Sequence, residues 1–275
     1  MPKLKIGFPL YLNTLPLLFF LPQNSKIEII VDIPKNLNFK LKKNLLQGGL
    51  VSSTHYAKNF EEYFLLPDIS ISAVGKVKSV ILFHHLPLEK LQNQKIGITP
   101  ETESSYALLR VLLEDFLKIH PAEYVELSHN LKELSWEKRK SLAAYLAIGD
   151  EALTLTQEHI FPYHTDLAEL WLKYTNLPFV FALIAVRKEI VEKFRDELKF
   201  LCYELYQARA KAFSNLKEIV EKSHLKIDKE VAYNYLTHLE HDFSPLKQKA
   251  FLTFCNFLYN KKIIPKVPQL NFFNL

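Results

Sequence analysis

The chain has 275 residues, 48% of them hydrophobic and 24% charged, so it can build a packed core and is not a disordered chain. Its formal net charge is +5, but lysine and arginine are spread along the sequence without a block of like charges, which suits a small anion at least as well as nucleic acid. Cys202 and Cys255 lie in apolar stretches, which predicts buried, reduced thiols rather than a disulfide framework or a zinc site.

The N-terminal apolar run at residues 8–21 is the segment that most resembles a targeting signal, because Lys3 and Lys5 precede it. Two prolines and Asn13 interrupt the run, and no small-x-small cleavage site follows it. We therefore expect a chain that stays in the cytoplasm. No other run approaches the ~18 consecutive apolar residues that a membrane span needs, so we expect no membrane association.

Strands and helices alternate in the first part of the chain, which predicts a largely parallel sheet with helices on its faces. Gly48 and Gly49 are expected to end the second helix, because glycine readily adopts the left-handed conformation of a helix stop. The expected elements are strands at 4–8, 26–33 and 50–52, a proline-bounded loop with Tyr11 and Asn13, and helices after Pro16 and at 37–46.

Two long apolar segments at 69–84 and 179–187 flank a self-contained α/β unit, and such a pair predicts a double crossover between two lobes. We therefore expect lobe two at 85–178 and a discontinuous lobe one at 1–84 plus 179–275. The other expected elements are a turn at Gly75, strands at 95–99, 122–127 and 142–148, helices at 104–119 and from about Asp150 and Asp166, and a helical C-terminal region broken near Ser214, Asp228 and Pro245.

A threonine and serine cluster before the amphipathic helix at 104–119 is the strongest local candidate for a ligand site. Thr102, Ser104 and Ser105 place hydroxyl groups beside the free backbone N–H groups of a positive helix end, which favours a carboxylate or phosphate. The alternative is a plain N-cap, in which Thr102 or Ser104 only satisfies donors of the helix itself, and from this segment alone capping is the more common arrangement.

Other small polar residues lie where the expected strands end or begin. Ser52 and Ser53 follow a strand at its carboxyl end, where open α/β sheets bind ligands. Ser79 lies in the first long segment and either binds a ligand or hydrogen-bonds within the sheet. Gly149 and Asp150 form a strand-to-helix turn, in which Asp150 is either an N-cap or a polar contact to a ligand.

Patterns of several common chemistries are missing from the sequence. It contains no GxxxxGK[ST], GxGxxG, HExxH, CxxC or GxSxG pattern, which disfavours phosphoryl transfer, dinucleotide redox chemistry, zinc hydrolysis and nucleophile-elbow chemistry. His84 and His85 are adjacent and would point to opposite faces of a strand. His238 and His241 have helical i, i+3 spacing, which predicts a solvated helix face rather than a metal site. We therefore expect neither a metal nor a cofactor.

Seven segments of this chain resemble those of a known family. They occur in the same order as in that family and span nearly the whole chain. They are IGFPLYLNTLPL (6–17), SSTHYAKN (52–59), ISAVGKVKSVILF (71–83), SSYALLRVLL (104–113), IGDEAL (148–153), DLAELWLKYTNLPFVFA (166–182) and YLTHLEHDFSPLKQKAFLTF (235–254). YLN with PL, GxVxSVxLF, IGDEAL and LPFVFA are specific in combination. On these segments the chain resembles the chorismate dehydratases of the futalosine route to menaquinone, which implies a two-lobed periplasmic-binding-protein type II-like fold with mostly parallel sheets and two crossover strands.

The resemblance also implies a reaction and a set of site residues. The reaction is elimination of water from chorismate, a small dicarboxylate, to give 3-[(1-carboxyvinyl)oxy]benzoate without a cofactor. By this resemblance Asn13 lies nearest the reacting ring and assists departure of the hydroxyl, and Ser79 is a donor at the floor of a cleft. Because no matched position offers a side-chain base, the hypothesised proton acceptor is the enolpyruvyl carboxylate of the substrate itself. The implied substrate contacts, with each serine pair holding one carboxylate, are Tyr11, Ser52, Ser53, Thr102, Ser104, Ser105, Gly149, Asp150 and Phe179.

Other functions stay open at this point. The dihydroxynaphthoate synthase of the same pathway shares the fold but carries an SPCPNDT-type N-terminal loop, where this chain has FPLYLNT. A non-catalytic binding protein for a small organic anion would have the same architecture and should carry an export signal. A ligand-sensing regulator is disfavoured because no DNA-binding helix-turn-helix segment is present. We expect a small-molecule partner and no nucleic acid, and whether the chain forms a homodimer stays open.

Overall fold

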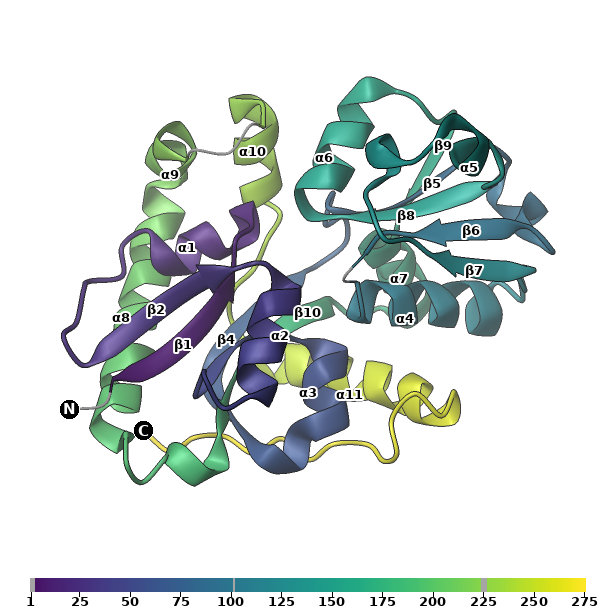
Figure 1. Ribbon diagram of the computed structural model, residues 1–275. Helices are drawn as coiled ribbons and strands as arrows, with labels where there is room; N and C mark the ends of the chain where they lie inside the picture. The colour runs from purple at the N-terminus through teal and green to yellow at the C-terminus, as the bar shows by residue number, and fades with distance from the viewer. Residues whose placement is uncertain (1–2, 101, 224–226) are drawn as a thin grey trace. The chain divides into compact units, whose positions relative to one another are not determined.

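The chain folds into two compact units, each built around one five-stranded sheet flanked by helices (Figure 1). This is the α/β architecture with a helical C-terminal region that the sequence predicts. The computed structural model describes residues 3–100, 102–223 and 227–275. Unit 1 comprises Met1–Ser72 with Val180–Leu275, and unit 2 comprises Ala73–Phe179.

The first boundary between the units lies earlier than the sequence suggests. The predicted boundary falls between residues 84 and 85, whereas the observed one falls between 72 and 73. The reason is the pairing of the strand Val80–His84, which hydrogen-bonds on both sides within the sheet of unit 2. The second boundary lies between residues 179 and 180, next to the predicted one.

The sheet of unit 1 places three parallel strands side by side. Its strands in spatial order are β2 (Ile27–Asp32), β1 (Leu4–Pro9), β3 (Gly48–Ser52), β10 (Phe179–Arg187) and β4 (Tyr63–Ala73). β1 pairs in parallel with β2 and β3, and β10 pairs antiparallel with β3. The loops after β1 and β3 therefore leave the same edge of the sheet, which we call the carboxyl edge of unit 1.

Gly48 and Gly49 begin β3 and do not end a helix, so this part of the sequence prediction was wrong. The preceding helix stops at Lys42, and Asn44 takes the left-handed conformation, with a φ of 59°. Close strand packing explains the glycines, because a Cβ at Gly48 would lie 2.6 Å from the carbonyl oxygen of Ala185.

The helices of unit 1 include a long helical C-terminal region. Its breaks after residue 214, near 228 and before 245 are the predicted ones. α2 and α3 contact the central strands of the sheet, and α8 contacts α1. The helices are α1 (Leu15–Leu18), α2 (Pro34–Lys42), α3 (Ser53–Asn59), α8 (Arg195–Ser214), α9 (Leu216–Lys222), α10 (Lys229–Leu236) and α11 (Pro245–Asn260), with 3-10 turns at Leu12–Thr14, Phe60–Glu62 and Lys188–Ile190.

The sheet of unit 2 combines parallel and antiparallel pairs. Its strands in spatial order are β7 (Glu123–Glu126), β6 (Lys95–Ile98), β8 (Ala144–Ile148), β5 (Val80–His84) and β9 (Tyr163–Asp166). β6 is parallel to β7 and β8, whereas β5 is antiparallel to β8 and β9. The carboxyl ends of β6, β8 and β9 and the amino end of β5 therefore share one edge, the carboxyl edge of unit 2.

Each helix of unit 2 follows a strand, and one helix is irregular. α4 (Ser104–Arg110) continues as a π-helical turn (Val111–Phe116) before the chain reaches β7. The remaining elements are α5 (Trp136–Lys140), α6 (Gly149–Glu158), α7 (Leu167–Thr175) and 3-10 turns at Leu88–Leu91 and Leu131–Glu133.

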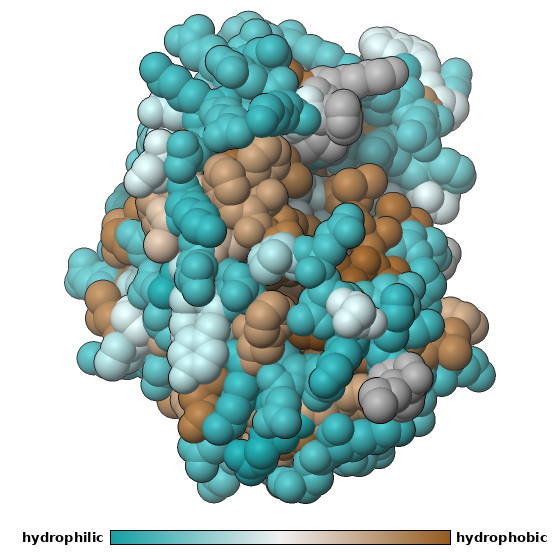
Figure 2. Space-filling model, turned by 90° about the vertical axis from the view of Figure 1, so that its left-hand side faces the viewer, coloured by the Kyte–Doolittle hydropathy of each residue, from teal (hydrophilic) through white to brown (hydrophobic). Residues whose placement is uncertain are grey.

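The two cysteines lie in the core, and one face of the surface carries apolar side chains. Cys202 in α8 and Cys255 in α11 are both buried free thiols, as predicted, and burial raises the pKa of Cys202 to about 12. Figure 2 shows apolar side chains gathered among hydrophilic ones on the face that lies at the left of Figure 1. Within residues 3–100, 102–223 and 227–275, no helix combines the length and hydropathy that crossing a membrane requires.

Candidate functional site

The loop that follows β1 carries Asn13 at the carboxyl edge of unit 1. A 3-10 turn at Leu12–Thr14 forms it, and the buried Thr14 hydroxyl donates toward the carbonyl oxygens of Tyr11, at 2.8 Å, and Pro9, at 3.1 Å. The carboxamide oxygen of Asn13 is buried and has no hydrogen-bond partner among the described residues. A buried acceptor without a donor is costly in a folded protein, so a ligand that donates a hydrogen bond would satisfy it.

A histidine that sequence reasoning assigned to solvent holds this loop from behind. Nε2 of His241 lies 3.0 Å from the backbone carbonyl oxygen of Asn13, and the side chain is only 2% exposed. Burial lowers the pKa of His241 to about 4, and the nearby cations Arg209 and Lys247 act in the same direction. The predicted solvated helix face was wrong for His241, because α10 ends at Leu236 before the chain reaches it.

The serine pair after β3 occupies two different environments. Ser52 is the N-cap of α3, and its hydroxyl accepts a hydrogen bond of 3.2 Å from the backbone N–H of His55. Ser53 is fully buried, and its hydroxyl donates to the carbonyl oxygen of Val180 at 2.6 Å. The Ser53 proton is therefore used inside unit 1, while both residues lie at the same sheet edge as Asn13.

In unit 2 the structure brings Ser79 and the Gly149 turn together. The carbonyl oxygen of Ser79 accepts a hydrogen bond of 2.7 Å from the backbone N–H of Gly149, whose φ of 58° suits glycine. Asp150 lies in the first turn of α6, but the N-cap position belongs to Ile148, so the capping alternative for Asp150 was wrong. Ser79, Gly149 and Asp150 thus share the carboxyl edge of unit 2, whereas the sequence prediction placed Ser79 within a long segment of lobe one.

The threonine and serine cluster follows β6 at that edge. Ser104 and Ser105 begin α4 and are 5% and 7% exposed. The N-cap position belongs to Glu103, and the buried Thr102 hydroxyl has no hydrogen-bond partner among the described residues, so the capping alternative for Thr102 was wrong. Glu101, the first residue of the ETESS segment, lies outside the described residues.

Two carboxyl groups that sequence reasoning did not select, the half-buried Glu151 and the buried Asp166, fix the loops of unit 2. Glu151 accepts hydrogen bonds of 2.8 Å from the Thr99 hydroxyl, the Leu131 backbone N–H and the Tyr145 hydroxyl. Burial raises the pKa of Glu151, although these donors act in the opposite direction. The usable signal was an acidic residue in the first turn of a helix that directly follows a strand.

Asp166 is the second such group. Its Oδ2 accepts a hydrogen bond of 2.7 Å from the backbone N–H of Lys78, the neighbour of Ser79. Its Oδ1 caps α7 by accepting from the backbone N–H groups of Ala168 and Glu169, and burial raises its pKa. Asp166 therefore ties the start of α7 to the residue before Ser79.

Phe179 packs in the interior of unit 2. It is 1% exposed, and its ring lies 5.5 Å from that of Trp171 in an edge-to-face arrangement. Its role as a substrate contact stays a prediction, as do the roles of the other selected residues. Among the residues the structure describes, no three His, Cys, Asp or Glu side chains are grouped to hold a metal ion.

Each unit thus presents neutral polar groups at its own carboxyl edge, joined in unit 2 by the carboxyl group of Asp150. Unit 1 offers the Asn13 carboxamide with Tyr11 and the Ser52 hydroxyl, and unit 2 offers hydroxyl groups with the turn at Gly149. Such groups orient and hydrogen-bond an anionic ligand, and they supply no strong nucleophile.

The chain is similar to known proteins in sequence and in structure. The chorismate dehydratase of Thermus thermophilus is 31% identical over 256 residues, which cover 86% of this chain and 89% of that protein. A Candida albicans protein described as having the generic periplasmic binding protein fold matches with a TM-score of 0.73 at 13% identity, covering 100% of this chain and 98% of that one. The periplasmic aliphatic sulphonate binding protein SsuA of Escherichia coli matches with a TM-score of 0.68 at 13% identity, covering 98% and 96%.

The structural matches establish the periplasmic-binding-protein-like fold and no more, because their sequence identities are low. The family assignment comes from the sequence. A family model described as menaquinone biosynthesis matches residues 4–260, which include both sheets and most of the helices. The chain therefore belongs to the menaquinone biosynthesis family.

Proposed function

We propose that this protein is a carbon–oxygen lyase that removes water from chorismate and forms 3-[(1-carboxyvinyl)oxy]benzoate. The relative from Thermus thermophilus is named for this substrate, and the family model names the pathway. We also propose that it acts in the cytoplasm, as an enzyme of the biosynthetic pathway that the family model names.

The proposed reaction removes a proton from ring C3 and the hydroxyl from C4. The C3–H electron pair becomes the new ring double bond and the C4–O bond breaks. The enolpyruvyl carboxylate takes the C3 proton and passes it to the departing hydroxyl, which leaves as water. Aromatisation of the ring supplies much of the driving force. The C3 proton is vinylogous to the ring carboxylate, which accepts charge as the proton leaves. A site that orients two carboxylates and the hydroxyl then suffices without a strong nucleophile.

The buried carboxamide oxygen of Asn13 is the observation that carries this proposal. It has no hydrogen-bond partner among the described residues, and the C4 hydroxyl of chorismate is a donor of the kind it lacks. A carboxamide accepts through its oxygen and donates through its nitrogen, so Asn13 can fix the hydroxyl and assist its departure. Ser79 is the second proposed catalytic group, and the hydroxyl groups of Ser52, Ser104 and Ser105 bind the carboxylates, since the Ser53 proton is used by Val180.

The proton acceptor in this proposal is the enolpyruvyl carboxylate of the substrate. The side chains closest along the chain to Asn13 and Ser79 are neutral hydroxyl and apolar groups, apart from Lys78, whose ammonium is a poor base at neutral pH. Substrate-assisted removal predicts that a chorismate analogue without the enolpyruvyl carboxylate binds but is not dehydrated.

The primary experiment incubates the purified protein with chorismate and follows loss of the diene absorbance and formation of the aromatic product by mass spectrometry. Turnover supports the lyase. Saturable binding of chorismate without turnover would instead support an anion-binding protein. If the protein neither binds nor converts chorismate, chorismate is rejected as the ligand.

A matched pair of asparagine variants tests the role of Asn13. Asn13→Ala should lower kcat about 100-fold or more, a loss comparable with removal of one preorganised polar contact in other enzymes. Asn256→Ala, at an exposed position of α11, should leave kcat unchanged. Wild-type kcat in the Asn13 variant would remove this residue from the catalytic site.

A further inference from the structure

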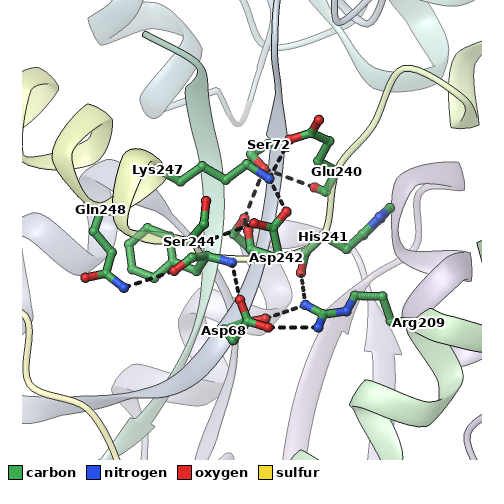
Figure 3. Close-up of polar contacts among 11 residues, drawn as sticks. Asp68, Ser72, Arg209, Glu240, His241, Asp242, Ser244, Lys247 and Gln248 are labelled. Carbon is green, nitrogen blue, oxygen red and sulfur yellow. Dashed lines mark hydrogen bonds and ion pairs between the residues drawn. The ribbon is translucent and has the colours of Figure 1, made fainter.

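The segment 240–244 lies between the last two helices and is bonded to three other elements of unit 1 (Figure 3). Ser72 and Glu240 exchange two backbone hydrogen bonds, each of 2.9 Å, so the segment adds a short bridge to β4. The backbone N–H of Phe243 donates to Oδ1 of Asp68 at 3.0 Å. These contacts join residues more than 160 positions apart in the sequence.

Charged side chains of α8 and α11 fix the same segment. Arg209 of α8 donates to the carbonyl oxygen of His241 at 3.2 Å and to the Asp68 carboxylate at 2.8 Å. Lys247 of α11 is 3% exposed and pairs with Asp242 and, at 2.6 Å, with Glu240. The backbone around His241 is therefore held from β4, α8 and α11 at once.

His241 extends from this fixed segment to the loop of Asn13. Its Nε2 lies 3.0 Å from the Asn13 carbonyl oxygen, and a carbonyl oxygen only accepts hydrogen bonds, so Nε2 carries the proton and donates. Burial keeps the ring neutral near pH 7. A neutral ring avoids placing a third cation beside Arg209 and Lys247.

We propose that His241 is a positioning residue, which donates from Nε2 to the Asn13 carbonyl and so fixes the direction of the Asn13 carboxamide for the reaction. This inference rests on the proposed function of Asn13. The Thr14 hydroxyl sets the internal shape of the loop, and His241 ties the loop to the rest of unit 1. Small displacements of a reacting group cost large factors in rate, so the tie acts on kcat.

Three variants separate positioning from general stability. His241→Met has a side chain of similar length and no donor. His241→Gln places an amide N–H near the position of Nε2. Ser72→Ala removes a hydroxyl that donates to the Glu240 carbonyl at 3.1 Å, so it weakens the same segment without touching the Asn13 loop. Thermal unfolding and the fraction of folded protein are measured for each.

The first readout is steady-state kinetics with chorismate. We expect His241→Met to lower kcat about 10- to 100-fold with a much smaller change in KM. His241→Gln should recover most of kcat, and Ser72→Ala should retain it at a similar loss of stability. Equal kcat per folded molecule in His241→Met and Ser72→Ala would overturn the inference.

The second readout needs no substrate, so it separates failure of this inference from failure of the proposed function. Hydrogen–deuterium exchange at residues 11–15 should become faster in His241→Met, return toward the wild-type rate in His241→Gln and stay unchanged in Ser72→Ala. If the wild-type protein does not convert chorismate but exchange follows this order, the proposed function is wrong. The inference that the His241 hydrogen bond fixes the Asn13 loop is then still supported. Unchanged exchange in His241→Met would overturn the inference whatever the kinetics show.

Discussion

The loops at the carboxyl edges of the two units are held by different chemistry. In unit 1 the loop of Asn13 is fixed by neutral donors, the Thr14 hydroxyl and the His241 ring. In unit 2 the loops converge on two carboxyl groups, the half-buried Glu151 and the buried Asp166, each of which accepts from several donors. Burial lowers the pKa of the histidine and raises the pKa of both carboxyl groups, so acid acts on the two edges in opposite directions.

Of the changes that test this difference between the units, removal of the Glu151 carboxyl group should lower the free energy of unfolding most. Glu151→Ala leaves the hydroxyl of the fully buried Tyr145 and the N–H of Leu131 without their acceptor. We expect a loss of about 3–5 kcal/mol in the free energy of unfolding. Urea unfolding followed by circular dichroism measures it. Gln157→Ala, at an exposed position of the same helix, is the control, and an equal shift in both variants would contradict the role of Glu151.

The second prediction is that a fall in pH destabilises unit 1 more than unit 2. His241 has a folded pKa of about 4 against an ordinary value of 6.5, so it stabilises the fold above pH 6.5 and loses this contribution as the pH falls toward 4. The full loss is about 3 kcal/mol, at ~1.4 kcal/mol for each pH unit of the difference. The charged groups that face this ring are Arg209 from α8, Lys247 from α11 and Asp242 beside it.

The carboxyl groups of unit 2 have the reverse sign. A raised folded pKa stabilises the fold below the unfolded pKa and loses that contribution as the pH rises through the folded value. Hydrogen exchange, corrected for its intrinsic pH dependence, should therefore show β1 and β3 losing protection between pH 7 and 4 more than β6 and β8. His241→Gln should remove most of the excess loss in unit 1. The same pH response in wild-type and variant would show that other groups control it.

A smaller effect is expected at Asp166, where one carboxylate serves two purposes. In Asp166→Asn the amide oxygen can still cap α7, but the amide N–H₂ then meets the backbone N–H of Lys78. We expect a loss of about 1–3 kcal/mol and faster exchange at Lys78 and Ser79. Asp228→Asn is the matched control, because this exposed aspartate caps α10 through two N–H groups and has no third donor among the described residues. Asparagine caps as well as aspartate, so Asp228→Asn should cost almost nothing.

Local patterns predicted most strands and helix starts. The predicted strand at 179–187 has the same first and last residues as β10. The breaks between the C-terminal helices fall where Ser214, Asp228 and Pro245 indicate. The strand β9 was missed because its sequence, YHTD, has no apolar run: it lies at the border of its sheet and is partly exposed. Pattern-based reading detects buried faces, and an exposed border strand has none.

The site was predictable only where its residues follow strands. Ser52 and Gly149 lie at the expected edges because strand ends determine their position. Ser79 directly precedes β5 in unit 2, whereas the sequence prediction placed it within a long segment of lobe one. His241 was not predictable, since its i, i+3 spacing to His238 suggested a continuing helix. The chain instead leaves α10 and bonds to β4, and that pairing depends on residues far apart in the sequence. Burial created by long-range pairing leaves no local pattern.

The smallest predicted effect concerns a position outside both edges. His159 ends α6 in the left-handed conformation, with a φ of 51°, and its side chain is exposed. This conformation costs a residue with a Cβ about 1 kcal/mol relative to glycine. His159→Gly should therefore stabilise the protein by up to ~1 kcal/mol, reduced by the greater entropy of glycine in the unfolded chain. His159→Ala keeps the Cβ and should give no gain, so equal urea midpoints for the two variants would show that α6 ends without strain at His159.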